Sequence, residues 1–100
     1  MAISKIIGSG LGTINSPVEF TSADNLAQIT LTSTDADANA GPILDFYRNS
    51  ASPADADLLG EITFNGKNDA GQDVNFAKIF STTIDASDGT EDGEISFKTM

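Results

Sequence analysis

Apolar and polar residues alternate with a period of two in five short runs of this chain. The third run shows the pattern clearly, with Ile62 and Phe64 on one side and Glu61 and Thr63 on the other. Successive side chains of a β-strand point to opposite faces, so this period predicts half-buried strands rather than helices. The five runs are residues 27–32, 43–48, 58–65, 74–84 and 94–98.

The fourth run alternates less regularly than the others. Val74, Phe76 and Phe80 fall on one side, but Lys78 interrupts them and Ile79 lies opposite. The run still has the β-branched and aromatic content that is typical of strands. We therefore predict a strand here, with Phe76 and Phe80 facing inward.

Clusters of Asn, Asp, Gly, Ser and Pro separate the runs, and these residues suit tight turns. The clusters read STDADANAGP, NSASPADAD, NGKNDAGQD and DASDGTEDG. Asn65-Gly66 is a hairpin signal, although the polar stretch that follows favours a longer loop. Strands at regular spacing with turns between them predict an all-β antiparallel module of the sandwich or fibre type. The one rival is a single helical turn in SADNLAQI, capped by Ser22 or Asp24.

The predicted core is thin. Only 24 of the 100 residues are Ile, Leu, Val or Phe, little above the roughly 20% that marks disordered chains of high net charge. A domain of this size also buries only about two-thirds of its unfolded surface. We therefore expect identical copies to share one interior, as a homotrimer. Its predicted oligomer core comprises Ile29, Leu31, Leu44, Phe46, Ile62, Phe64, Phe76, Phe80, Ile95 and Phe97.

The charge of the chain argues against two classes of partner. Fifteen acidic residues against five basic ones give a net charge of −10, and the basic residues form no cluster. Nucleic acids and anionic membranes both require clustered Lys and Arg, so we expect neither as a partner. Cys and His are absent from the sequence, which excludes a disulfide framework and a thiolate metal site. No apolar run approaches a signal-peptide core or a membrane span.

We predict that residues 1–17 form an extended N-terminal arm and that residues 18–100 form a β-rich module. The arm is rich in glycine and shows no helical face, so we expect it to become ordered only against a partner; a frayed terminus is the alternative. The initial Met favours a true N-terminus. Small apolar residues are the candidate docking contacts of this arm: Ile3, Ile6, Ile7, Leu11 and Ile14.

Two acidic clusters are weak candidates for calcium binding. In the first, Asp35, Asp37 and Asn39 place oxygen ligands at alternate positions, as calcium loops do. The EF-hand loop, however, requires Gly at its sixth position and Glu at its twelfth, whereas here Gly41 is seventh and Phe46 is twelfth. An ordinary solvated loop is therefore the favoured interpretation, and we expect no cofactor.

The second cluster contains Asp85, Asp88 and Glu91. Packed carboxylates repel one another unless a cation or water screens them. Asp88-Gly89 is also a good turn dipeptide, and a predicted strand follows shortly after it. We favour a chain reversal over a cation site here.

No catalytic constellation is present in the sequence, and we expect a protein that is not an enzyme. A carboxylate pair such as Asp45 and Glu61 is set in no glycosidase motif, and no Ser or Thr lies in a nucleophile signature. The segment Phe46-Tyr47-Arg48 joins aromatic rings to a guanidinium. A structural role is favoured for it, with Arg48 paired to Asp55 or Asp57.

The order of motifs from residue 41 to residue 100 resembles a module of tailed-phage virion proteins, especially fibre-like appendages of marine phages. The shared pattern is a strand ending in YR, then SASPADAD, the strand LLGEITF, the loop NGKNDAGQ, a strand of AKI type, and DASDGTEDGEISFKTM. Each motif alone is only a turn or a strand, but the set is specific. Residues 1–40 match less distinctly.

The resemblance implies a non-enzymatic, commonly homotrimeric module of a tail fibre or spike. Its N-terminal part would attach to other virion proteins, and a distal part of the complete fibre would meet a host surface glycan. In longer relatives more strands or a shaft follow the final TM, so continuation beyond Met100 stays open. One alternative is a capsid decoration protein. An alternative of another class is a calcium- or glycan-binding β-module of a bacterial surface protein, which a calcium-dependent melting temperature would reveal.

Overall fold

The computed structural model describes residues 12–100 of the chain. The chain divides into two units, Met1–Ile43 and Leu44–Met100, which are described separately. Residues 12–43 of the first unit contain neither helix nor strand. All strands of the described residues lie in the second unit, and no helix there is long and apolar enough to cross a membrane.

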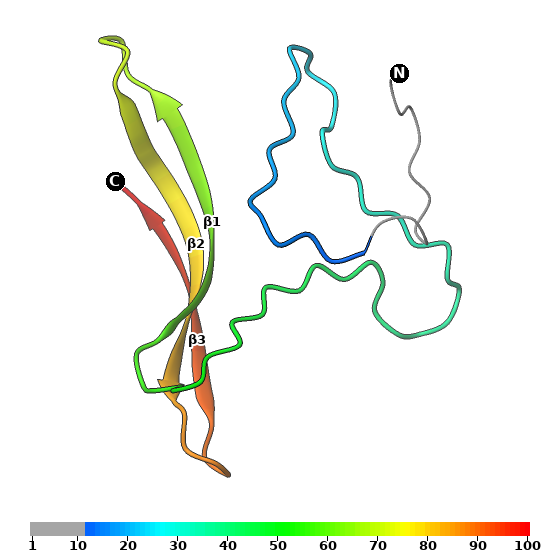
Figure 1. The fold of residues 1–100 in the computed structure, drawn as a ribbon, viewed down its shortest axis with the longest axis vertical. Helices are drawn as coiled ribbons and strands as arrows, with labels where there is room; N and C mark the ends of the chain where they lie inside the picture. Colours follow the sequence, from blue (N-terminus) through cyan, green and yellow to red (C-terminus); the bar gives the residue numbers. More distant parts are fainter. Residues whose placement is uncertain (1–11) are drawn as a thin grey trace. The chain divides into compact units, whose positions relative to one another are not determined.

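The second unit is one open antiparallel sheet in the order β1-β2-β3, with β2 in the centre (Figure 1). Its strands are β1 (Leu58–Lys67), β2 (Asp73–Asp85) and β3 (Asp92–Thr99). The predictions of strands at residues 58–65, 74–84 and 94–98 are confirmed. The all-β antiparallel class is confirmed as well, as a single sheet without a second layer in the described residues.

Two predicted strands are wrong. Residues 27–32 and 43–48 alternate as expected, yet neither forms a strand. A strand requires a neighbour that accepts and donates its backbone hydrogen bonds, and the described part of the chain offers these runs none. The rival helical turn is also absent: Asp24 instead accepts a side-chain bond from Ser22 and a backbone bond from Leu26, at 3.2 and 3.0 Å.

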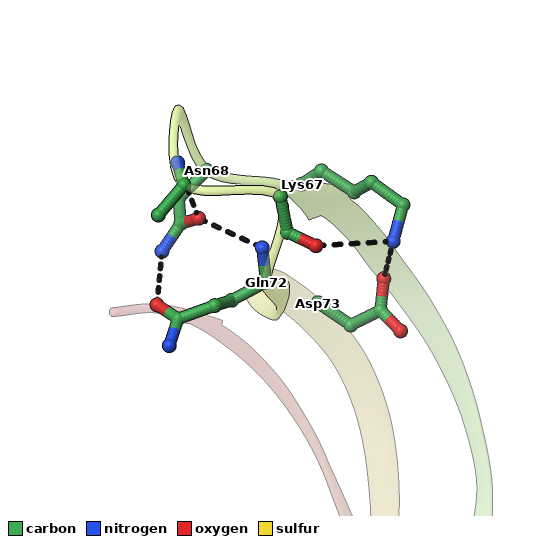
Figure 2. Close-up of polar contacts among 6 residues, drawn as sticks. Lys67, Asn68, Gln72 and Asp73 are labelled. Atoms are coloured by element: carbon green, nitrogen blue, oxygen red, sulfur yellow. Dashed lines mark hydrogen bonds and ion pairs between the residues drawn. The ribbon is translucent and has the colours of Figure 1, made fainter.

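The turn between β1 and β2 is organised by Asn68 (Figure 2). Its Oδ1 accepts the backbone N–H groups of Ala70 and Gln72 at 3.0 and 2.9 Å, and its Nδ2 donates to Gln72 Oε1 at 2.8 Å. Gly71 has a φ of +77°, where a side chain would be strained. The predicted longer loop is thus confirmed, and β1 runs on through Gly66 to Lys67.

The turn between β2 and β3 is held by Asp85. One carboxylate oxygen accepts the backbone N–H of Ser87 at 2.8 Å, and the other accepts the Thr90 hydroxyl at 2.9 Å. Gly89 has a φ of +90°. The acidic cluster therefore serves a chain reversal, as the sequence favours.

The register contains three irregularities, and they decide which side chains share a face. Leu59, Phe76 and Ile84 are each skipped in the pairing of their strand with its neighbour. Such an extra residue changes the phase of the alternation. Phe76 consequently lies beside Gly66, where an added Cβ would be 3.3 Å from its ring.

Because of this phase change, the sequence grouping of Phe80 with Val74 and Phe76 is wrong. Val74 pairs with Gly66, which lies on the same side of β1 as Ile62 and Phe64. Phe80 pairs with Glu61 instead and so lies on the other side. The physical reason is the extra residue at Phe76, which a strictly regular strand would not contain.

Candidate functional site

One face of the sheet is almost entirely apolar. Cross-strand partners point to the same side of an antiparallel sheet, and Ile62, Ile79 and Phe97 are partners across the three strands. The cross-strand pairs before and after this row on the same side of the sheet add small or apolar residues. We call this surface the apolar face, and its sheet residues are Gly60, Ile62, Phe64, Gly66, Val74, Phe76, Ala77, Ile79, Ser81, Ile95, Phe97 and Thr99.

Phe46 extends the apolar face although it belongs to no strand. A Cβ on Gly60 would be only 3.1 Å from the Phe46 Cβ, so the absence of a side chain at Gly60 lets Phe46 approach the sheet. Phe46, Ile79 and Ile95 are among the residues that line an open depression of about 310 Å³. The sheet thus presents a hollow beside Phe97, which does not line it.

The large side chains of the apolar face are not covered. Six of them, Phe46, Ile62, Phe64, Phe76, Ile95 and Phe97, have exposed fractions from 42% at Ile62 to 75% at Phe97, whereas Val74 and Ile79 are half-buried. No residue of 12–100 is buried, so this part of the chain has no closed core. A contiguous exposed apolar patch of this kind marks an interaction surface in a folded protein.

The opposite face of the sheet is polar and charged. Lys78 Nζ lies 3.0 Å from Glu61 Oε1 and 4.8 Å from the centre of the Phe80 ring. Ser96 and Lys98 continue this face on β3, as partners of Phe80 and Lys78. The two faces of the sheet therefore differ in polarity.

The loop that precedes β1 is fastened to the end of β2. Thr83 makes two backbone hydrogen bonds to this loop. Its carbonyl accepts the N–H of Ala56 at 2.7 Å, and its N–H donates to the carbonyl of Asp57 at 2.9 Å. Asp55 Oδ1 accepts the backbone N–H of Ala86 at 2.9 Å. These bonds hold the SPADAD segment in place, so its acids have structural roles in this unit.

Arg48 also contributes to this arrangement. Its guanidinium donates to the Leu58 carbonyl at 2.9 Å and lies 3.5 Å from Asp57 Oδ1. The predicted partner was Asp55 or Asp57, and Asp57 is confirmed. The backbone docking on Thr83 was missed, because it joins residues far apart in sequence that carry no charge signal.

The first group of calcium candidates forms a series of local turns. Asp35 accepts the backbone N–H of Asp37, and Asp37 accepts that of Asn39 at 2.8 Å. The bond from the Asn39 backbone, followed by one from its side chain, lowers the pKa of Asp37. The carboxylates therefore accept hydrogen bonds from their own loop.

The second group behaves in the same way. Backbone and side-chain bonds from Ser87, with the Thr90 hydroxyl, lower the pKa of Asp85. Its own backbone N–H and that of Gly89 lower the pKa of Glu91. Asp88 lies in the same turn. Within residues 12–100, no group of three or more carboxylates is arranged to hold a metal ion.

The predicted oligomer core is only partly brought together. Phe46, Ile62, Phe64, Phe76, Ile95 and Phe97 lie on the apolar face, and Phe80 lies on the opposite one. Ile29, Leu31 and Leu44 are exposed outside the sheet. Ile79 was missed as a core residue. Phe80 was predicted to face inward, and strict alternation then makes its neighbour Ile79 face outward.

The predicted docking arm lies mostly outside the described residues. This holds for Ile3, Ile6, Ile7 and Leu11, while Ile14 is described and exposed. The arm itself stays a prediction.

Comparison with known protein families, with curated proteins and with solved structures finds no match to this chain.

Proposed function

We propose that this chain is a structural component of a bacteriophage virion, a tail-fibre or appendage module that assembles as a homotrimer and has no enzymatic activity. One observation carries the proposal: a sheet with an uncovered apolar face in a chain where no residue of 12–100 is buried. Such a chain completes its core with other chains. Building an extended assembly from identical copies is the task of a fibre subunit.

The order of motifs supports the same assignment. The strand, loop and turn segments that resemble phage appendage modules coincide with the second unit, from the Arg48 contacts to β3. The loop SPADAD fixes β2, and the DASDGTEDG segment closes the β2–β3 turn. The recurring motifs thus correspond to the parts that hold the sheet together, which suits a module with a mechanical role.

In this role the protein attaches to the particle through its N-terminal part and supports host adsorption. Other virion proteins are its partners, and a host surface glycan would be met by a distal part of the appendage. The virion is its location.

The test is immunogold electron microscopy on purified particles from a strain that carries the gene, with antibody raised against the recombinant chain. Label at the tail is the expected result. Label on the head would favour a decoration protein. Particles that carry no label, and in which mass spectrometry finds no peptide of this chain, would contradict a role as a virion component. Deletion of residues 1–17 should abolish incorporation while the circular dichroism of the sheet persists; retained incorporation would refute the docking role of the arm.

A further inference from the structure

We infer that the apolar face is the surface through which copies of this chain associate, with Phe97 of one copy entering the depression beside Phe46 and Gly60 of the next. The inference deepens the proposed function and rests on it for the expectation of a homotrimer. The surface itself follows from the geometry of the sheet.

The first argument is area. Phe46, Ile62, Phe64, Phe76, Ile95 and Phe97 are each between 42% and 75% exposed. At about 200 Å² for a fully exposed large side chain, they present roughly 650 Å² of apolar surface. A stable specific interface buries about 800 Å² per partner. Six side chains alone therefore approach the required area.

The second argument is charge. Every copy carries a net charge of −10, so two copies repel unless the surfaces that meet are neutral. The sheet residues of the apolar face carry no charge, whereas the opposite face contains Glu61, Lys78, Glu94 and Lys98. Glu61 also lines the depression, but its carboxylate is paired with Lys78 at 3.0 Å. Association through the apolar face keeps Lys78, Glu94 and Lys98 in water, where they are well solvated.

The third argument is shape. The same face carries both an exposed ring, Phe97, and an open apolar depression of about 310 Å³ that Phe97 does not line. Phe46 closes one side of this depression because Gly60 has no side chain. A surface that carries both a projection and a hollow can be complementary to itself, which is what a symmetric assembly of identical chains requires.

The experiment compares two neighbouring substitutions on β3 in the full chain. Phe97→Asp places a carboxylate on the apolar face, and Ser96→Asp places one on the opposite face. Sedimentation equilibrium at micromolar concentration should show that Phe97→Asp weakens association at least a hundredfold and yields monomers, whereas Ser96→Asp retains the oligomer. Equal effects, or dissociation by Ser96→Asp alone, would overturn the inference.

A second measurement decides the matter even if Phe97→Asp fails to fold. The chain has no Cys, so Ile95→Cys and Ser96→Cys each introduce a single thiol. In the oligomer, maleimide should modify Cys at position 95 at least tenfold more slowly than Cys at position 96. Equal rates would overturn the inference, as would a protected position 95 in a monomer, which would mean that residues of the same chain cover the face.

The two proposals fail separately. Virion label combined with an oligomer that Phe97→Asp leaves intact would overturn the interface and leave the proposed function standing. Association through the apolar face in a protein that is absent from virions would overturn the proposed function and leave the interface standing.

Discussion

Residues 27–32 and β1 have the same alternating pattern, yet only β1 is a strand. Ile29 and Leu31 lie on one side of residues 27–32, as Ile62 and Phe64 lie on one side of β1. The difference lies in their surroundings. The Asn68 turn returns the chain directly, so β2 satisfies the backbone of β1, whereas residues 27–32 have no strand partner in the described chain. Alternation thus indicates which residues can form a strand, and a partner determines whether they do.

The largest expected effect concerns backbone protection in these two regions. Residues 27–32 have no strand partner in the described chain, whereas β2 is bonded to a strand on each side. The amides in the middle of β2 should therefore exchange with solvent about a hundredfold more slowly than those of residues 28–32. Hydrogen exchange measured by mass spectrometry checks this. Protection of residues 28–32 equal to that of β2 would show that this run does have a partner.

The second prediction weakens the turn that distinguishes β1 from residues 27–32. Gly71→Ala should lower the free energy of unfolding by about 1–2 kcal/mol, because φ at this position is +77°. Gly93→Ala is the matched control, since its φ is not in the left-handed region and the nearest atom to an added Cβ is 3.7 Å away. Urea unfolding at fixed protein concentration measures both. Equal losses would mean that the turn conformation is not what closes the hairpin.

The third prediction tests the attachment of the SPADAD loop to β2. Asp55→Ala removes the acceptor of the Ala86 N–H bond and should cost about 1 kcal/mol. Asp69→Ala removes an equal charge in the β1–β2 turn, where the side chain that accepts the backbone bonds is that of Asn68, and should change the stability by less than about 0.5 kcal/mol. If the two variants melt alike, the loop is not fastened by Asp55.

The fourth prediction concerns pH and the β2–β3 turn. The hydrogen bonds from Ser87 and Thr90 hold the pKa of Asp85 below its usual value of 3.8. Since the folded-state pKa is the lower one, this stabilisation is complete above the unfolded-state pKa and is lost as the pH falls through the folded-state pKa. Asp85→Asn should therefore reduce the dependence of stability on pH below about pH 4. An NMR titration of the Asp85 carboxyl that gave a raised pKa would contradict this.

The smallest effect is expected at an ion pair. Lys67 Nζ lies 2.7 Å from Asp73 Oδ1 across the start of the β1–β2 turn, but both side chains are largely exposed. Exposed pairs contribute little, so Lys67→Ala should cost about 0.5 kcal/mol or less, and 1 M salt should remove the difference. A loss above 1 kcal/mol that persists in salt would mean that Lys67 acts through packing.

The sequence was sufficient for the parts of the fold that depend on neighbours in the chain. It predicts β1, β2 and β3 nearly to their ends and the turn at Asp85. It narrows the partner of Arg48 to Asp55 or Asp57, of which the structure shows Asp57. It assigns Phe80 to the wrong face because the extra residue at Phe76 arises from the match between two strands, which no single run reveals. The bond from Ala86 to Asp55 joins residues 31 positions apart, and local patterns carry no information about such a contact.

The apolar face is predictable in kind and not in detail. Ile62, Phe64, Ile95 and Phe97 were placed together on an inner side from alternation alone, and the sheet brings them onto one face. The roles of Gly60 and Ile79 require the register, because they follow from which residues stand opposite one another. Phe46 was also placed in the core, but as part of a strand at residues 43–48 that does not form. Its approach to Gly60 from outside any strand requires coordinates.

The mass of the unmodified chain in solution tests the central claim most directly. Native mass spectrometry or sedimentation equilibrium at micromolar concentration should give three times the 10.4 kDa of the chain, with cooperative unfolding whose midpoint rises with protein concentration. A species of 10.4 kDa that unfolds cooperatively, with a midpoint independent of concentration, would show that one chain closes its own core and would contradict the account.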